Sequence, residues 1–171
     1  MSFAKKKIFV TGVAGFLGSH LAEKLVELGH DVIGIDNMLG GYEDNVPKNI
    51  EFHKGDCCDF KKVQSIMKGV DIVYHCAATA HEGLSVFSPY EITKNNYLAS
   101  VAIFSAAVNH KVKRIIFCSS MARYGEQATP FTEKMKPAPV DPYAISKVAS
   151  EEVLKNLCDL NNIEWVIAVP H

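Results

Sequence analysis

The sequence has no long hydrophobic run, no excess of one charge and no paired cysteines. Because no stretch of about 18 apolar residues occurs, we expect no membrane-spanning helix and no membrane partner. The 18 basic and 19 acidic side chains give a net charge of −1, without the basic footprint typical of nucleic-acid binders. The 5 cysteines lack disulfide or zinc-ribbon spacing, and the histidines are scattered. We therefore expect reduced thiols, no metal site and a cytoplasmic protein.

Apolar patterning predicts a single domain in which six strands alternate with helices. The 171 residues suit one domain, and the 48% hydrophobic share excludes a disordered chain. The expected strands are 7–10, 31–35, 50–53, 71–75, 114–118 and 165–169, and the expected helices are 16–28, 60–67, 89–108 and 142–160. Asp141 is expected to cap the last helix and Pro142 to begin it. This alternation predicts a doubly wound parallel sheet with helices on both faces.

The first predicted strand runs into a glycine-rich turn that opens a helix. Gly12, Gly15 and Gly18 follow the spacing G-x-x-G-x-x-G. Such a turn lets the backbone approach a pyrophosphate, and the helix N-terminus supplies free N–H groups to bind it. A glycine pattern alone also fits a turn that binds nothing. Its position between a strand and an amphipathic helix favours a dinucleotide cofactor.

Asp36 ends the second predicted strand, where the adenosine ribose of such a cofactor lies. A carboxylate there accepts hydrogen bonds from the ribose hydroxyls and repels a 2′-phosphate. Asn37 and the two residues after it supply no arginine to bind that phosphate. The sequence therefore favours NAD over NADP.

Tyr143 and Lys147 begin the last predicted helix, one turn apart on the same face. We expect the lysine ammonium to lower the pKa of Tyr143 toward neutrality, so that the phenol acts as an acid/base. Ser119 and Ser120 end the fifth strand at the sheet edge where ligands bind. Ser120 is positioned to hydrogen-bond the oxygen that Tyr143 protonates. A solvated helix face and a capped turn are the plain structural alternatives.

These motifs together resemble the NAD-dependent epimerase/dehydratase group of the extended short-chain dehydrogenase/reductases. The resemblance rests on 11–18, Asp36-Asn37, Gly55-Asp56 with Asp59, 75–78, Ser85, Pro89, Asn96, 118–120, Tyr124-Gly125, Pro142-Tyr143 and Lys147. It implies a Rossmann-type doubly wound parallel sheet of about six strands. It also implies a nucleotide-sugar substrate that is epimerised at C4 through a transient 4-keto sugar.

The resemblance assigns a role to each motif. Ser120, Tyr143 and Lys147 are the implied catalytic residues: Tyr143 takes the sugar hydroxyl proton, Ser120 holds the developing carbonyl oxygen, and Lys147 binds the nicotinamide ribose. The implied cofactor-binding residues are Gly12, Gly15, Phe16, Leu17, Gly18, Asp36, Asn37, Asp56, Cys57, Ala77, Ala78, Asn96, Cys118, Tyr143, Lys147 and Pro170.

Departures from the family pattern narrow the range of expected reactions. Related dehydratases and decarboxylases carry acidic residues just after the serine position, whereas Met121 and Ala122 cannot transfer protons. Dehydration is therefore disfavoured and simple 4-epimerisation favoured. Arg123 stands where the family often has a small or aliphatic residue. It could face a phosphate or solvent, and solvent is the favoured expectation. His171 replaces part of an Arg-Tyr-Phe element and is expected near the nicotinamide.

Two other functions stay open on the sequence. One is an NAD-dependent reductase or dehydrogenase of another small carbonyl or alcohol. The other is a cofactor-binding module without activity, because family members run to about twice this size and their C-terminal substrate domain is absent from residues 1–171. The two long helices resemble those of a family dimer, so we expect a homodimer in the full-length protein.

Overall fold

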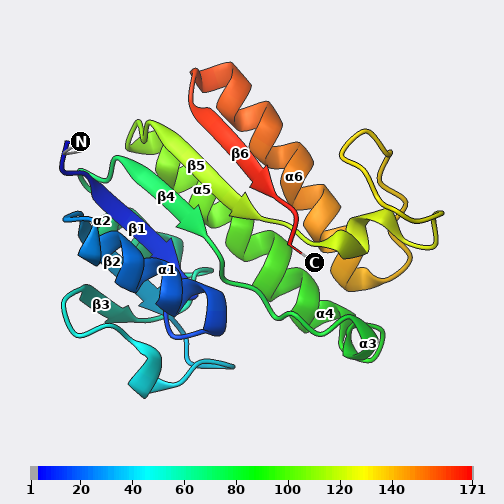
Figure 1. Ribbon diagram of the computed structural model, residues 1–171, viewed down its shortest axis with the longest axis horizontal. Coiled ribbons are helices and arrows are strands. Elements are labelled where there is room, and N and C mark those ends of the chain that lie inside the picture. The colour runs from blue at the N-terminus through cyan, green and yellow to red at the C-terminus, as the bar shows by residue number, and fades with distance from the viewer. Residues whose placement is uncertain (1–3, 171) are drawn as a thin grey trace.

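The computed structural model describes residues 4–170 and contains one six-stranded parallel sheet. The strands are β1 (Lys7–Thr11), β2 (Asp31–Asp36), β3 (Glu51–Lys54), β4 (Ile72–His75), β5 (Arg114–Cys118) and β6 (Glu164–Ala168). Their spatial order is β3-β2-β1-β4-β5-β6, and every neighbouring pair is parallel (Figure 1). The chain winds outward from β1 in both directions, which confirms the doubly wound sheet.

Helices cover both faces of this sheet, but unequally. The principal helices are α1 (Phe16–Glu27), α2 (Phe60–Ile66), α5 (Ala99–Asn109) and α6 (Pro142–Asn161). Apolar side chains of α2, α5 and α6 form the larger core cluster with the sheet, around residues such as Phe104 and Leu154. Those of α1 form a second cluster on the opposite face with β1 and β2. Val166 of β6 is 47% exposed, so this second face is left partly uncovered near β6.

The predicted helix from Pro89 to Val108 is one continuous helical path in three parts. It consists of α4 (Pro89–Ile92), a π-helical turn η2 (Thr93–Leu98) and α5. A π-helical turn inserts an extra residue, which rotates the side chains that follow and is frequent at functional sites. Apolar spacing does not reveal such a turn, because the core-facing positions continue on both sides of it.

Three short helices lie in the connections, and the ends of α6 follow from its sequence. The connections contain η1 (Glu43–Asn45), α3 (Glu82–Ser85) and η3 (Met121–Tyr124). As expected, the Asp141 carboxylate caps α6 by accepting a hydrogen bond from the Ala144 N–H at 2.8 Å, and Pro142 begins the helix. Asn162, with φ 55°, ends it in the left-handed conformation.

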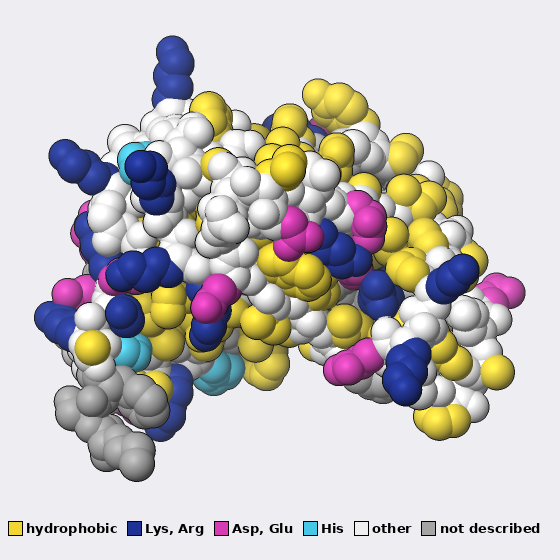
Figure 2. All heavy atoms as spheres, turned by 90° about the horizontal axis from the view of Figure 1, so that it is seen from above, with side chains coloured by type: hydrophobic (Ala, Val, Ile, Leu, Met, Phe, Trp, Pro, Cys, Tyr) yellow, Lys and Arg dark blue, Asp and Glu magenta, His cyan; other side chains and the backbone are white. Residues whose placement is uncertain are grey.

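The surface carries both signs of charge. On the face shown in Figure 2, basic and acidic side chains are interspersed. Over residues 4–170, no helix is long and apolar enough to cross a membrane.

Candidate functional site

A cavity of about 410 Å³ opens at the carboxyl ends of the central strands. This size falls in the range of about 300–1,000 Å³ that is usual for small-molecule sites. It lies where the strand order reverses between β1 and β4, the place at which doubly wound sheets bind ligands. Its walls include Gly12, Gly15, Phe16, Leu17, Gly18, Asp36, Asn37, Asp56, Cys57, Cys76, Ala77, Ala78, Thr79, His81, Asn95, Cys118, Ser119, Tyr143, Lys147 and Pro170.

The glycine turn brings backbone close to backbone on one wall. Gly12 has φ 71°, and a Cβ there would lie 2.8 Å from the Ala77 nitrogen on the neighbouring strand end. A Cβ on Gly18 would overlap the Gly12 carbonyl. Gly15 is the N-cap of α1 and no side chain bonds the first amides of that helix. These amides are therefore available to a phosphate, and the residues fit a dinucleotide pyrophosphate.

Asp36 is held rigidly beside this turn. One carboxylate oxygen accepts a hydrogen bond from the Ala14 N–H at 3.0 Å, and the other accepts one from the Met38 N–H at 2.7 Å. Each oxygen keeps a second lone pair for a ligand hydroxyl. Asp36 is 8% exposed and lines the cavity, so its charge faces whatever binds there.

Tyr143 and Lys147 project from the first turns of α6 into the same cavity. Lys147 is 3% exposed, and its ammonium donates a hydrogen bond to the Cys118 carbonyl at 2.8 Å. Burial lowers the pKa of Lys147 to about 8. Ser120 caps η3 by accepting a hydrogen bond from the Ala122 N–H at 3.2 Å. Its hydroxyl also lies close enough to the Tyr143 phenol to influence the pKa of that phenol. The three side chains thus converge at the end of β5.

The expected lowering of the Tyr143 pKa is wrong in this structure. Burial raises the pKa of Tyr143, while the Ser120 hydroxyl acts in the opposite direction. The Lys147 ammonium lies 5.8 Å from the Tyr143 ring centroid and is hydrogen-bonded to backbone instead. Helical spacing alone therefore brings the two residues near each other without a direct ammonium–phenol contact.

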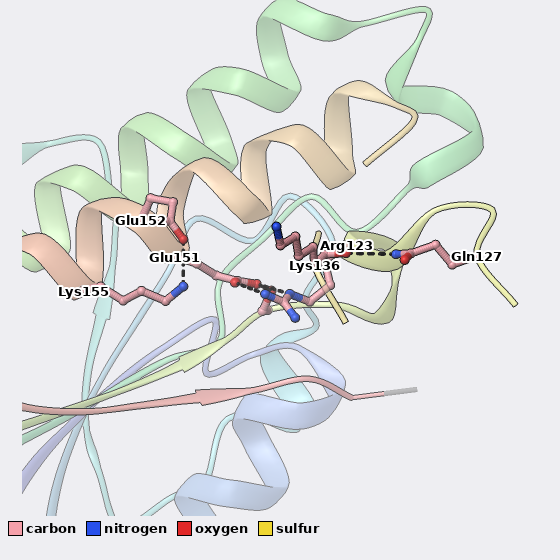
Figure 3. Close-up of polar contacts among 7 residues, drawn as sticks. Arg123, Gln127, Lys136, Glu151, Glu152 and Lys155 are labelled. Atoms are coloured by element: carbon pink, nitrogen blue, oxygen red, sulfur yellow. Dashed lines mark hydrogen bonds and ion pairs between the residues drawn. The ribbon is translucent and has the colours of Figure 1, made fainter. Parts of the chain in front are cut away.

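Arg123 is a second correction, because it is buried and does not face solvent. Its guanidinium, in η3, makes two hydrogen bonds of 2.9 and 2.8 Å to the Glu151 carboxylate of α6 (Figure 3). Glu151 is fully buried and also accepts a hydrogen bond from Ser119. Attraction and hydrogen bonds from Glu151 raise the pKa of Arg123 against the effect of burial. This network joins α6 to the segment that carries Ser120.

His75 lies directly behind the cavity with no exposure to solvent. Its Nε2 is 2.8 Å from the Ser100 hydroxyl, which itself donates to the Asn96 carbonyl at 2.5 Å. Nε2 must therefore carry the proton, and Nδ1 accepts from the Thr11 hydroxyl at 2.7 Å. Burial lowers the pKa of His75 to about 3, so the ring is neutral and serves to join β4, β1 and the η2–α5 helix.

Two predicted site residues do not form cavity wall. Asn96 is 2% exposed, and its amide is used inside the protein: it accepts from the Thr79 N–H at 2.7 Å and donates to the Ser146 hydroxyl at 3.3 Å. The π-helical turn carries Asn95 into the wall and leaves Asn96 behind Thr79. Ser120 lies beside Tyr143 at the margin, while Ser119 is in the wall. His171 lies outside the described residues.

Several other residues of the cavity wall were not predicted from the sequence. Cys76 is half-buried in the wall, as is Cys118, which the family resemblance implied as a cofactor-binding residue. Sequence alternation gave a signal for this, since each directly follows a core-facing position at a strand end. Leu39, Gly40, Gly41 and Thr79 come from loops whose course no pattern predicted.

A family model described as the NAD dependent epimerase/dehydratase family matches residues 8–171. The chain belongs to this family. The expected membership of the extended short-chain dehydrogenase/reductases is thereby confirmed.

Relatives and solved structures of this family agree with the match. A putative UDP-glucose 4-epimerase of Methanocaldococcus jannaschii is 36% identical over 163 residues, which are 94% of this chain and 53% of the relative. The UDP-glucose 4-epimerase of Thermotoga maritima, solved with UDP-glucose, is 32% identical, with a TM-score of 0.90 over 94% of this chain and 54% of that one. The UDP-glucose 4-epimerase of Brucella ovis, solved with NAD, is 29% identical, with a TM-score of 0.91 over 96% of this chain and 51% of that one. The chain thus spans about half the length of the curated relatives it matches.

Proposed function

We propose that the chain is the cofactor-binding half of an NAD-dependent nucleotide-sugar 4-epimerase. The observation that carries the proposal is the convergence of two groups on one cavity. The glycine turn and Asp36 form one end of it, and Tyr143 and Lys147 form the other. The family match and the similarity to UDP-sugar 4-epimerases support the same function.

In this proposal the chain's own residues bind the cofactor and move one proton. The free amides of α1 hold the pyrophosphate, and Asp36 accepts hydrogen bonds from the adenosine ribose. A bound NAD would supply reversible hydride transfer at the sugar C4. Tyr143 takes the proton of the C4 hydroxyl and gives it back, while Ser120 donates a hydrogen bond to the C4 oxygen. Lys147 donates to the nicotinamide ribose.

Ser120 is followed in η3 by Met121 and Ala122, which favours epimerisation over dehydration. Neither side chain can take a proton from a neighbouring sugar carbon. A one-way dehydrogenase or reductase would use the same Tyr143 and Lys147, and remains the alternative activity.

Calorimetry of the chain with NAD, NADP and UDP-glucose tests the cofactor part. We expect binding of NAD, weaker binding of NADP and feeble binding of UDP-glucose. A chain that is folded by circular dichroism and does not bind NAD would overturn the proposal. Turnover of UDP-glucose with stoichiometric NADH release would instead favour the dehydrogenase, and NAD binding without any turnover would favour a module that needs a substrate domain.

We also propose a cytoplasmic homodimer for the full-length protein. Large apolar side chains on the outer faces of the α4–η2 path and α6 support it: Tyr90 is 76%, Leu98 52% and Ile145 53% exposed. Light scattering of the full-length protein tests this, and a monomer at micromolar concentration would contradict it.

A further inference from the structure

Two thiols face each other in the wall of the cavity. The parallel pairing of β4 with β5 places His75 opposite Phe117. The next residue on each chain segment is a cysteine, so Cys76 and Cys118 lie in register at neighbouring strand ends. Their side chains point to the same side, and the sulfur atoms are 3.6 Å apart.

This placement meets the geometric demands of a disulfide. Neighbouring strands lie about 4.7–4.9 Å apart, and disulfides join Cα atoms separated by about 4.4–6.8 Å. The sulfurs need to approach to about 2.05 Å, a change that small side-chain rotations supply. Both thiols are half-buried and line the cavity, so a small solute that enters the cavity reaches them.

The environment makes the two thiols unequal. The two thiols share a hydrogen bond, and the Lys147 ammonium adds its positive charge nearby; together they lower the pKa of Cys118 to about 7 against the effect of burial. The same hydrogen bond, together with burial, raises the pKa of Cys76. Near neutral pH, Cys118 therefore carries the larger thiolate fraction of the two, and it is the expected nucleophile of the pair.

The remaining cysteines provide a contrast within the chain. Burial raises the pKa of Cys57, raises that of Cys58 to about 11, and raises that of Cys158 to about 11. All three are free thiols without a lysine that outweighs this effect. Oxidation by a solute is thus expected to select Cys118.

We infer that Cys76 and Cys118 form a peroxide-sensitive dithiol that closes to a disulfide in the cofactor cavity. The Cys118 thiolate attacks hydrogen peroxide, the O–O bond breaks, and hydroxide leaves and takes a proton to become water. The Cys76 sulfur then attacks the resulting Cys118 sulfenic acid, the S–O bond breaks, and the departing hydroxide takes the Cys76 proton. Two thiols are oxidised to one disulfide, and one peroxide is reduced to two waters.

The consequence for the cofactor rests on the proposed function, but the oxidation chemistry does not. The Cys118 carbonyl accepts the Lys147 hydrogen bond. A disulfide moves the Cys118 sulfur toward Cys76 within the cavity wall and removes the negative charge of the Cys118 thiolate near the Lys147 ammonium. Oxidation is therefore expected to weaken NAD binding, and bound NAD is expected to slow oxidation by covering the thiols.

Peptide mapping of the reduced chain tests the inference directly. The chain is treated with a small excess of hydrogen peroxide, alkylated with N-ethylmaleimide, digested without reductant and analysed by mass spectrometry. We expect a Cys76–Cys118 linked peptide that dithiothreitol removes, while Cys57, Cys58 and Cys158 stay alkylated. Equal oxidation of Cys58, or no linked peptide from a chain that is folded by circular dichroism, would overturn the inference.

Three variants assign the roles. Cys118→Ser is expected to leave Cys76 fully alkylatable, and Cys76→Ser to leave a Cys118 sulfenic acid that dimedone traps. Cys158→Ser, at the far end of α6, is the matched control and keeps the linked peptide. Oxidation of Cys76 at the wild-type rate in Cys118→Ser would contradict the assigned order. Mapping in the presence of NAD separates the two proposals. A chain that forms the disulfide at the same rate with and without NAD would support the dithiol but contradict NAD binding in this cavity.

Discussion

Arg123 and Glu151 form a buried ion pair that joins the segment after β5 to the middle of α6. Two hydrogen bonds of 2.9 and 2.8 Å link the guanidinium to the carboxylate (Figure 3), and the Ser119 hydroxyl donates a third hydrogen bond to Glu151. The pair lies between the two elements that carry Ser120, Tyr143 and Lys147. It therefore fixes the relative position of the proposed catalytic groups.

Removal of Arg123 alone is predicted to destabilise the fold strongly. Arg123→Met leaves the Glu151 charge buried without its partner, which costs about 3–5 kcal/mol in comparable proteins. Adding Glu151→Gln removes that charge and keeps an acceptor for Ser119, so the double variant is expected to regain more than half of the loss. Urea unfolding followed by circular dichroism measures both.

The neighbouring pair Lys155–Glu152 is the matched control on the same helix (Figure 3). Its nitrogen and oxygen are 2.7 Å apart, but Glu152 is 65% exposed, so Lys155→Ala is expected to change stability by about 1 kcal/mol or less. Equal losses for Arg123→Met and Lys155→Ala would show that burial of the Arg123 pair has no special weight.

This pair also marks the limit of what the sequence predicts. The strands, the main helices and the Asp141 cap follow from local apolar spacing and turn residues, and the structure confirms them. Arg123 looks like a surface residue because its partner lies 28 positions away. A contact of that kind depends on how η3 packs against α6, and no periodicity encodes it.

The cavity residues also divide into those that local motifs predict and those that depend on tertiary packing. The glycine turn and Asp36 are local motifs with their own physical signature, and they line the cavity as a group. The position of Asn96 depends on a π-helical turn, and the Cys76–Cys118 contact on strand register. The raised pKa of Tyr143 depends on burial. These features arise from tertiary packing, which sequence spacing does not show.

Gly18→Ala is predicted to damage both the fold and NAD binding. The added Cβ would overlap the Gly12 carbonyl. Neither a Cβ nor a backbone carbonyl can rotate away, so the backbone itself must shift. We expect a loss of about 1–3 kcal/mol in the free energy of unfolding and no measurable NAD binding by calorimetry. Gly83→Ala is the control, because nothing lies within 4 Å of a Cβ there. If Gly18→Ala binds NAD like Gly83→Ala, the close approach of α1 to the turn is not needed for binding.

His75 is predicted to make stability fall below neutral pH. Burial lowers its pKa from 6.5 in the unfolded chain to about 3 in the fold, so between these values only the unfolded chain binds the proton. The stability present above pH 6.5 is thus lost as the pH falls toward 3, by at most about 1.4 kcal/mol per pH unit.

Urea midpoints at pH 7, 6, 5 and 4 measure this slope. His75→Asn removes the titrating group, and its slope is expected to be smaller than that of the wild type, whatever its stability at pH 7. His53→Asn is the control: this histidine lies near Glu51 at the surface, and its removal should leave the steep part of the slope in place. Parallel slopes for the wild type and His75→Asn would contradict the buried neutral ring.

Asp36 is predicted to set the preference for NAD over NADP by charge and to hold its loop by hydrogen bonding. Its carboxylate accepts from the Ala14 and Met38 amides at 3.0 and 2.7 Å, so Asp36→Ala loses both the loop contacts and the ribose acceptors. Because hydrogen bonds to charged groups contribute about 1.5–3 kcal/mol, NAD affinity is expected to fall by about tenfold or more. Asp36→Asn keeps an acceptor oxygen but removes the charge, so NADP is expected to bind better than it does to the wild type. Calorimetry of the three chains with both cofactors separates the effects, and an unchanged NADP affinity in Asp36→Asn would refute repulsion as the source of the preference.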